Sequence, residues 1–320
     1  MSDALFETAN ERKPDLSLKI AGVLFRNPVI AASGTFGCGK EYSSFFDISL
    51  LGGICSKGLT VTPRAGNTGI RIWETPSGLL NSIGLENSGI NVFLERDLPY
   101  LKQSGAVIIA NLSGAESGEY IRGAEILNES SVDMIELNIS CPNMKAGGMA
   151  FGLDPGTAAA LVAAVRRKCS DKPLVVKLSP NAPSLASVAL ACVRAGADAL
   201  SLVNTFKAMA IDLVNKRPVF DYITAGLSGP AIKPIALRMV WELFDTLKES
   251  NMQVPIIGIG GISCANDALE FIMAGAAAVQ IGSATLVNPY SMPDIIDGII
   301  QYMKNNGIYD LGKISIRNEK

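Results

Sequence analysis

The chain alternates short, almost wholly apolar runs with longer segments whose apolar residues recur at helical spacing. Strands of a parallel sheet read as continuous runs of Val, Ile, Leu and Ala, because helices cover both faces of the sheet. The regular alternation of strand and helix therefore predicts an α/β fold. The predicted strands span residues 28–33, 53–58, 107–112, 134–140, 174–178, 199–204, 255–260 and 278–282. Eight parallel strands of this kind predict a closed (β/α)8 TIM barrel.

The segments between these strands carry the signals of helix ends. Asp154 followed by Pro155 supplies a capping side chain and a proline for the first helical turn. Ser184 and Ser263 are the predicted caps of two further helices. Those helices close with the similar sequences Arg-Ala-Gly-Ala at 194–197 and Met-Ala-Gly-Ala at 273–276. Glycine at such a place ends a helix and turns the chain back toward the next strand.

Two connections are too long for plain strand-to-helix loops. Residues 60–91 and 205–230 are rich in Gly and Pro and contain short apolar runs. They predict short hairpin insertions that roof the C-terminal face of the barrel, where lids usually bind ligands. We expect residues 1–17 to form a polar N-terminal extension and residues 18–320 to form a single barrel domain.

Composition narrows the class of protein. Hydrophobic residues make up 48% of the 320 positions and charged residues 18%, which fits a soluble enzyme with much buried strand. The net charge of -2 argues against a nucleic-acid surface. The polar N-terminus and the lack of a long apolar run predict no signal peptide and no membrane anchor.

Cysteine and histidine usage limits the possible chemistry. The six cysteines have no paired C-x-x-C spacing, so neither a disulfide framework nor a metal site is indicated, and a reducing cytoplasm is expected. The chain contains no histidine. Acid–base chemistry must therefore use Cys, Lys, Asp, Glu, Tyr or Ser/Thr.

Polar residues or glycines stand at the C-terminal end of every predicted strand, on the face where barrel enzymes build their sites. Loops are polar in any fold, which accounts for a single Asn or Ser. The general polarity of loops accounts less well for Lys57 and Lys177, because charged groups are normally avoided beside buried apolar runs. In chain order the ends carry Ser33 and Gly34, Lys57, Asn111, Asn138 and Cys141, Lys177, Asn204, Gly260 and Gly261, and Gly282 and Ser283.

The last two strand ends favour a phosphate site. Paired glycine turns after the seventh and eighth strands are where barrels commonly hold a phosphate on backbone N–H groups. Lys177 could be a Schiff-base nucleophile, a surface charge or a fixed cation for an anionic cofactor. The three asparagines favour the last interpretation, because amides suit a flat ring with alternating C=O and N–H groups. The site is therefore predicted to take a phosphate-bearing planar cofactor and a planar, amide-like substrate.

Cys141 is the best candidate base. It follows a polar strand end and opens a glycine-rich segment, 145–152, that could close as a lid. A thiol with a reference pKa near 8.5 can exchange a proton near neutral pH. Cys169 and Cys192 are expected to be buried within helices and Cys55 within the second strand. Cys38 and Cys264 fall in loops or caps and receive no role.

Taken together, these motifs resemble the class 1 dihydroorotate dehydrogenases, and within them the catalytic subunit of the class 1B type. The resemblance extends from about Leu18 to near the end of the chain. Its most specific parts are Ala-Ser-Gly at 32–34, Asn-Ser-Ile-Gly-Leu at 81–85, residues 138–148, Val-Asn-Thr at 203–205, residues 226–234 and the two glycine turns. Two segments, 55–60 and 111–114, depart from the usual pattern and leave the local flavin contacts there less well defined.

The resemblance implies an FMN-containing barrel that oxidises (S)-dihydroorotate to orotate in de novo pyrimidine (UMP) synthesis. Cys141 would remove the proton from C5, the hydride from C6 would pass to FMN, and Lys177 would stabilise the negative charge of the reduced flavin. FMN would contact Ser33, Lys57, Gly58, Asn111, Asn138, Lys177, Val203, Gly229, Gly260, Gly261, Gly282 and Ser283. The substrate would contact Lys57, Asn81, Ser82, Ile83, Gly84, Leu85, Asn138, Asn143, Asn204 and Thr205.

The class 1B type further implies a partner subunit that carries FAD and an iron–sulfur cluster and passes electrons to NAD. The expected assembly is a heterotetramer with a homodimer of this chain at its core. A class 1A homodimer that uses fumarate is an alternative.

Three rival functions remain open. One is another flavin barrel, such as a dihydrouridine synthase or an enzyme that resembles the pyrimidine-reducing domain of dihydropyrimidine dehydrogenase. A second is a flavin-free aldolase with Lys177 as its Schiff-base residue, and a third is a scaffold without catalysis.

Overall fold

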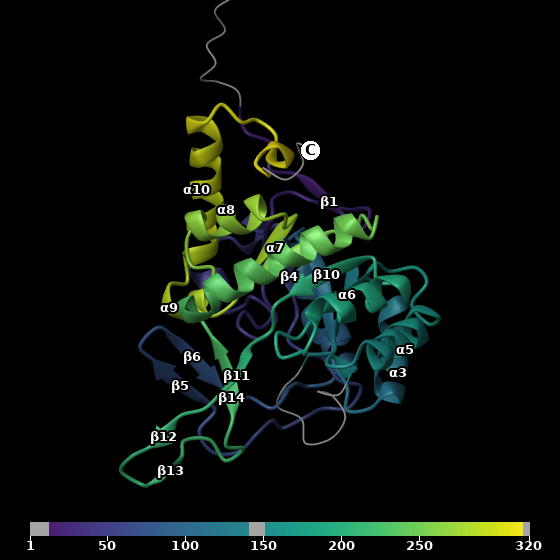
Figure 1. The fold of residues 1–320 in the computed structure, drawn as a ribbon, viewed down its shortest axis with the longest axis vertical. Helices are drawn as coiled ribbons and strands as arrows, with labels where there is room; N and C mark the ends of the chain where they lie inside the picture. The colour runs from purple at the N-terminus through teal and green to yellow at the C-terminus, as the bar shows by residue number, and fades with distance from the viewer. Residues whose placement is uncertain (1–12, 141–150, 316–320) are drawn as a thin grey trace, which may run out of the picture.

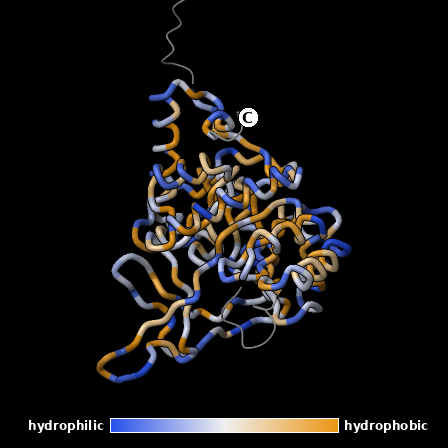
Figure 2. Tube along the Cα trace, viewed as in Figure 1, coloured by the Kyte–Doolittle hydropathy of each residue, from blue (hydrophilic) through white to orange (hydrophobic). Residues whose placement is uncertain are grey.

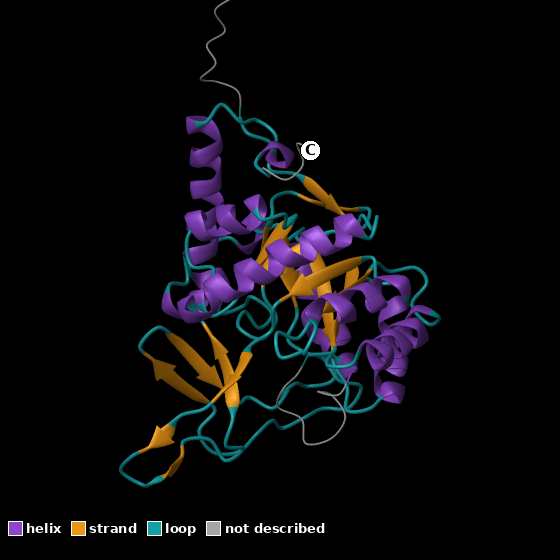
Figure 3. Cartoon of the chain, viewed as in Figure 1, coloured by secondary structure: helices purple, strands orange, loops and turns teal. Residues whose placement is uncertain are grey.

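In the computed structural model, which describes residues 13–140 and 151–315, the predicted barrel is closed. Each barrel strand pairs in parallel with the next barrel strand along the chain, and the last strand pairs with the first. The strands lie in the centre and helices surround them (Figures 1 and 3). The (β/α)8 prediction is confirmed. The barrel strands are β3 (Val29–Ala31), β4 (Gly53–Cys55), β7 (Val107–Leu112), β8 (Met134–Asn138), β9 (Leu174–Lys177), β10 (Ala199–Leu202), β15 (Ile256–Ile259) and β16 (Ala278–Ile281).

Several predicted strands end earlier than expected. Ser33, Gly58, Asn204 and Gly260 were placed inside strands, but each lies in the loop that follows one. The regular ladder of parallel pairing stops before these residues, although the N–H of Asn204 still donates to the carbonyl of Leu178 at 3.3 Å. These four candidate site residues therefore lie on loops that the strands position, whereas Asn138 and Lys177 are the last residues of their strands.

The helices follow the strands, with the exception of the first connection, which holds the 3₁₀ turns η1 (Tyr42–Ser44) and η2 (Ile48–Leu50). The helices are α1 (Ile90–Val92), α2 (Leu98–Gln103), α3 (Ser117–Asn128), α5 (Pro155–Arg166), α6 (Leu185–Arg194), α7 (Lys233–Glu249), α8 (Ala265–Met273), α9 (Ala284–Val287) and α10 (Ser291–Asn305). A π-helical stretch, η3 (Phe93–Asp97), joins α1 to α2, and the 3₁₀ turns η4 (Pro230–Ile232) and η5 (Leu311–Lys313) precede α7 and follow α10.

Two of the three predicted helix caps are confirmed. The side chain of Asp154 accepts a hydrogen bond from the N–H of Thr157 at 2.7 Å. The side chain of Ser184 caps α6 in the same way. The third prediction is wrong by one residue, because Cys264 and not Ser263 is the cap of α8. The carboxylate of Asp267 causes the shift, since it accepts from the backbone N–H groups of both residues and draws Ser263 outside the helix.

Most of the core lies between the barrel and its helices, and a smaller core fills the bottom of the barrel. Figure 2 shows hydrophobic positions gathered toward the centre of the molecule. Because side chains alternate along a strand, every second residue points into the barrel. The lower inward positions are apolar and pack against Ile20 and Phe25 of the hairpin formed by β1 (Leu18–Ile20) and β2 (Val23–Phe25). That hairpin closes the N-terminal end of the barrel.

The two long connections form one sheet, whereas separate hairpins were predicted. Its strands are β5 (Ile72–Thr75), β6 (Gly78–Asn81), β11 (Phe206–Ala208) and β14 (Ala225–Ser228), in the order β11-β14-β6-β5. The antiparallel pairing of β14 with β6, in which Gly226 lies opposite Asn81, joins the two connections. A small hairpin of β12 (Ile211–Asp212) and β13 (Arg217–Pro218) extends from this roof sheet (Figure 1).

The described ends of the chain lie together. The N–H of Asp15 donates to the carbonyl of Tyr309 at 3.0 Å, and the N–H of Leu311 donates to the carbonyl of Asp15 at 3.1 Å. The predicted division into an extension and a barrel domain stays a prediction. None of the helices described here has the length and apolar character needed to cross a bilayer.

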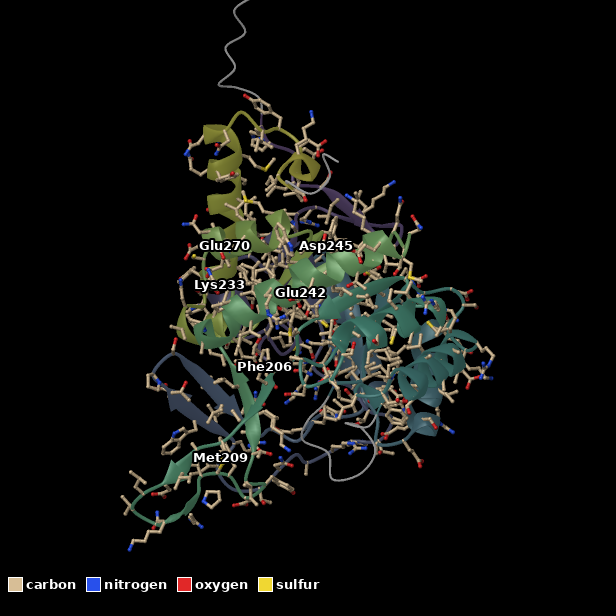
Figure 4. The ribbon with its side chains drawn as sticks, viewed as in Figure 1. Phe206, Met209, Lys233, Glu242, Asp245 and Glu270 are labelled. Carbon is tan, nitrogen blue, oxygen red and sulfur yellow. The ribbon has the colours of Figure 1, made fainter. Side chains whose placement is uncertain are left out.

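An ion-pair cluster ties α7 to α8. Lys233 contacts Asp267 at 2.7 Å and Glu270 at 3.0 Å, and Figure 4 shows Lys233 and Glu270 on these neighbouring helices. Burial alone would raise the pKa of Asp267. The Lys233 ammonium and the hydrogen bonds from Ser263 and Cys264 outweigh burial and lower that pKa from 3.8 to about 2.

We expect Asp267→Asn to lower the free energy of unfolding by about 1–2 kcal/mol at pH 7. A carboxylate whose pKa falls on folding stabilises the fold above its unfolded pKa. The difference between wild type and variant should therefore shrink as the pH falls from about 4 toward 2. Urea unfolding at several pH values measures the free energy of unfolding of both proteins. Glu242→Gln, in the exposed Arg238–Glu242 pair, is the control. A difference that is the same at pH 7 and pH 3 would contradict this assignment.

Candidate active site

A pocket lies at the C-terminal mouth of the barrel, beneath the roof sheet. Its walls come from the loops after the barrel strands and from roof residues such as Leu79. Of the predicted cofactor residues, the pocket brings together Ser33, Lys57, Gly58, Asn138, Lys177, Val203, Gly260, Gly261, Gly282 and Ser283. Of the predicted substrate residues, it brings together Lys57, Asn81, Ile83, Gly84, Leu85, Asn138, Asn204 and Thr205.

Five predicted site residues fall outside this lining. Cys141 and Asn143 lie outside the described residues. Asn111 points into the barrel interior, where its Nδ2 donates to Glu136 Oε2 at 2.6 Å. Ser82 is buried, and its hydroxyl accepts from Asn67 Nδ2 at 3.0 Å. Gly229 packs so closely on Gly78 that a Cβ added to it would lie 2.7 Å from the Gly78 Cα.

Lys177, at the floor of the pocket, belongs to a buried ion pair. Lys177 is 5% exposed and Glu136 is 0% exposed, and Lys177 Nζ lies 3.8 Å from Glu136 Oε2. Burial alone would raise the pKa of Glu136. The charge of Lys177 and hydrogen bonds from Ser201, Gln280 and Asn111 outweigh burial and lower that pKa. The floor therefore holds a fixed carboxylate beside a fixed cation.

The predicted asparagines meet at neighbouring strand ends. Asn138 Nδ2 donates to Asn111 Oδ1 at 3.4 Å, and Asn204 Nδ2 donates to Ser140 Oγ at 2.8 Å. Ser140 Oγ in turn donates to Asn138 Oδ1 at 2.9 Å. This network holds the amides of Asn138 and Asn204 side by side at the edge of the pocket. Two fixed amides can recognise a ring that carries both donors and acceptors.

The glycine turns after β15 and β16 bring backbone without side chains to the pocket. Gly260 and Gly261 have positive φ angles of 131° and 70°, which residues with a side chain rarely adopt. A Cβ on Gly261 would lie 2.7 Å from the Gly229 oxygen and 2.8 Å from the Lys233 nitrogen. At Gly282, by contrast, an added Cβ would meet no atom closer than 3.7 Å. The open space at Gly282 and the glycine turn at 260–261 fit an oxyanion held on backbone groups.

Two buried polar atoms at the pocket have no partner within the described part of the chain. They are Thr35 Oγ1 and Gln280 Oε1, and both residues line the pocket. An unpaired buried polar atom costs roughly 1–3 kcal/mol. A ligand with matching polar groups would remove that cost. This observation, the floor cation and the glycine turns together fit a phosphate-bearing planar cofactor such as FMN.

A charged cluster lies at the edge of the pocket. Lys57 Nζ lies 3.8 Å from Glu86 Oε2, which also contacts Arg71 Nη1 at 2.7 Å. The hydrogen bond from Arg71 and the charge of Lys57 lower the pKa of Glu86. Lys57 and Glu86 both line the pocket, so Lys57 can contact a ligand there.

Cys55, Cys169 and Cys192, which are the buried cysteines in the described part of the chain, are unsuited to act as bases. Burial raises the pKa of Cys192 to about 12 and also raises that of Cys169. Burial and the neighbouring Glu136 raise the pKa of Cys55 well above its usual value. Cys192 lies in α6 and Cys55 in β4 as predicted, but Cys169 lies beyond the end of α5. These three thiols stay protonated at neutral pH.

The sequence analysis did not identify Thr35, Glu136, Ser201 or Gln280. The last three had a detectable signal, because each is a polar residue at an inward position of a mostly apolar strand. Two residues earlier on the same strands stand Met134, Ala199 and Ala278, which are apolar. Where the inward residues of several strands change from apolar to polar, the apolar core at the bottom of the barrel ends and the polar residues near the pocket begin.

The chain is similar to known proteins over most of its length. A protein-family model described as dihydroorotate dehydrogenase matches residues 15–303. A protein of Petrotoga mobilis named dihydroorotate dehydrogenase B (NAD(+)), catalytic subunit, is 55% identical over 300 residues, which cover 94% of this chain and 98% of the relative. Proteins of the same name from Geotalea daltonii and Geotalea uraniireducens are 52% and 50% identical over 303 residues, which cover 94% of this chain and 97% of each relative.

Proposed function

The chain belongs to the dihydroorotate dehydrogenase family, and from this premise we propose that it oxidises (S)-dihydroorotate to orotate in de novo pyrimidine synthesis. The observation that carries the proposal is the pocket in which Lys177, Asn138 and Asn204 converge beneath the roof sheet. A barrel fold alone hosts many reactions, so the function rests on this set of side chains and on the family.

FMN is the proposed cofactor. The flavin supplies a two-electron acceptor for the hydride that leaves C6 of the substrate. The glycine turns at 260–261 and 282–283 would hold its phosphate, and Lys177 would offer a positive charge to the ring. The unpaired Thr35 Oγ1 and Gln280 Oε1 add polar groups that a bound ring can satisfy. Ser33, Lys57, Gly58 and Val203 complete the pocket wall.

The substrate is proposed to bind between the cofactor site and the roof sheet. Asn138 and Asn204 would fix the pyrimidine ring through its amide groups, helped by Asn143 and Thr205. Residues 81–85 of the roof and Lys57 would hold the substrate from above. Cys141 would take the proton from C5 as the hydride leaves C6, and the C5–C6 double bond of orotate forms.

The electrons are proposed to leave through a partner subunit. The relatives are named catalytic subunits of an NAD(+)-dependent enzyme, which implies a second subunit in those proteins. We infer an equivalent partner here that carries FAD and an iron–sulfur cluster and reduces NAD, with a homodimer of this chain at the core of a heterotetramer. The cytoplasmic location expected from cysteine usage stays a prediction.

The Lys177 environment favours this function over a Schiff-base aldolase. A Schiff-base lysine needs an amine free to attack a carbonyl, whereas Lys177 Nζ is held 3.8 Å from a fully buried carboxylate. Colour separates the two functions, because a flavin protein is yellow as purified. A colourless protein that does not bind added FMN would contradict the proposal.

Genetic complementation and substrate choice test the reaction itself. The gene is expected to restore growth without added pyrimidines in a strain that lacks dihydroorotate dehydrogenase, when the gene for the partner subunit is supplied with it. The purified protein should oxidise dihydroorotate but not dihydrouracil, which lacks the carboxylate. Oxidation of dihydrouracil in preference would move the chain to the dihydropyrimidine dehydrogenase-like function.

A further inference from the structure

Glu136 is a fully buried carboxylate that contacts side chains from five other barrel strands. It accepts from Asn111 Nδ2 of β7 at 2.6 Å, Ser201 Oγ of β10 at 2.7 Å and Gln280 Nε2 of β16 at 2.8 Å. Cys55 Sγ of β4 lies 3.3 Å away, and Lys177 Nζ of β9 lies 3.8 Å away. Both carboxylate oxygens are therefore occupied, and no other side chain of the described barrel has so many partners from separate strands.

Stability alone does not explain a carboxylate at this position. Replacing a buried ion pair by well-packed apolar side chains is often neutral or stabilising. The position two residues earlier on the same strand is Met134, which is fully buried in the apolar core at the bottom of the barrel. Glu136 thus stands at the border between that core and the pocket.

The partners of Glu136 reach the pocket, although Glu136 itself does not line it. Lys177 and Gln280 both line the pocket. Gln280 uses its Nε2 on Glu136, and this bond leaves Oε1 unpaired and available to a ligand. Asn111 connects Glu136 to Asn138 through a 3.4 Å hydrogen bond, and Asn138 also lines the pocket. One carboxylate therefore contacts Lys177 and Gln280 directly, and Asn138 through Asn111, at the pocket.

We propose that Glu136 is a positioning residue that serves as the counter-ion of Lys177 and orients Gln280 and Asn138 toward the cofactor. The proposal rests on the proposed function in one respect, namely that a flavin occupies the pocket. Its main consequence concerns protons. With Lys177 already an ammonium, reduction of the bound flavin by two electrons takes up one proton. The positive charge of Lys177 balances the negative charge that the reduced ring gains.

Removing the carboxylate changes this proton count. Besides the pair itself, the titratable group that contacts Glu136 is the protonated thiol of Cys55 from β4. The other contacts, Asn111, Ser201 and Gln280, do not titrate. In Glu136→Gln, Lys177 would be a buried ammonium without a counter-charge, which favours the neutral amine. Reduction by two electrons would then take up two protons, one on the flavin and one on Lys177.

The reduction potential of the bound flavin as a function of pH tests the proposal. Between pH 7.5 and 9.5 the reduction potential of the wild-type holoenzyme is expected to fall by about 30 mV per pH unit, which is the slope for one proton taken up per two electrons. The potential of Glu136→Gln should fall by about 60 mV per pH unit, which is the slope for two protons taken up per two electrons. The control Ser201→Ala removes a hydrogen bond but no charge and should keep the wild-type slope. The double variant Glu136→Gln/Lys177→Met has no amine to titrate and should return to about 30 mV.

A second measurement does not depend on flavin or on dihydroorotate. Acetic anhydride modifies neutral amines, and peptide mass spectrometry gives the extent at Lys177 in protein prepared without flavin. At pH 8 the labelling rate of Lys177 should be at least ~10-fold higher in Glu136→Gln than in wild type, with exposed Lys168 as the internal reference. Circular dichroism checks that the variant is folded.

Either of two outcomes overturns the proposal. One is an unchanged slope in a Glu136→Gln variant that binds FMN, and the other is an unchanged labelling rate at Lys177. Failure of the proposed function has a different signature. A protein that never binds FMN would give no potential, but the labelling difference would persist and would still support the pairing of Glu136 with Lys177.

Discussion

Replacing Cys141 by alanine is expected to leave FMN bound and to slow its reduction by dihydroorotate by roughly 10²–10⁴-fold, the usual cost of losing one acid–base group. The chain has no histidine to take over the proton. Cys55, Cys169 and Cys192 have raised pKa values and stay protonated. Anaerobic mixing of each enzyme with dihydroorotate, followed at the flavin absorbance, gives the rate.

The pH dependence sharpens this prediction. The wild-type rate should rise with pH as a thiol becomes a thiolate, and Cys141→Ser should need a higher pH because a hydroxyl is a weaker acid. Cys264→Ser is the matched control, since Cys264 is exposed and caps α8, where serine is a favourable cap. A Cys141→Ala enzyme that is reduced at the wild-type rate would remove Cys141 from the mechanism.

Gly261→Ala is expected to weaken FMN binding by roughly 100-fold or more, as expected for the loss of one or two hydrogen bonds to a charged group. The added Cβ would lie within 2.8 Å of backbone atoms of Gly229 and Lys233, at a φ angle of 70° that alanine rarely adopts. The turn must shift, and its backbone N–H groups would then no longer be aimed at the phosphate. Titration of flavin fluorescence measures the affinity.

Riboflavin provides the discriminating comparison for this variant. It has the same ring as FMN but no phosphate, so its affinity should fall much less than that of FMN in Gly261→Ala. Gly118→Ala in α3 serves as the control, because an added Cβ there meets no atom within 4 Å. An equal loss of affinity for both flavins would place the phosphate elsewhere and leave Gly261 with a role in folding alone.

The barrel and most of its mouth could be predicted from local sequence. Each parallel strand is buried on both faces and is therefore a continuous apolar run, such as residues 107–110 of β7. The residue that follows such a run lies at the C-terminal face by necessity. This is why Lys57, Asn204 and the glycine pairs could be placed at one mouth without knowledge of their contacts.

The remaining features depend on contacts between distant segments. Gly226 lies opposite Asn81 in the roof sheet, 145 positions along the chain, and no local pattern specifies that pairing. Glu136 likewise bonds to Gln280, which is 144 positions away. The pattern of polar residues in apolar strands indicates that such side chains need partners, but only the closed barrel shows which ones meet. The cap of α8 was misplaced because the reach of Asp267 across the first turn depends on the exact path of the backbone.

The positive charge at the pocket floor belongs to a side chain that its neighbours hold in place. In the described segments, no group of three or more metal-binding side chains occurs. The positive charge of the pocket floor comes instead from Lys177, which is held by Glu136 and surrounded by barrel strands. A charge fixed in this way would need little reorganisation if a bound cofactor gained negative charge.

An anaerobic stopped-flow spectrum of the purified yellow protein mixed with dihydroorotate tests the central claim most directly. Rapid bleaching of the flavin absorbance, with formation of one orotate per flavin, is expected even without a partner subunit, because the proposed reductive half-reaction would use only the pocket of this chain. A flavin spectrum that stays oxidised with dihydroorotate, while another dihydropyrimidine bleaches it, would contradict the proposed substrate.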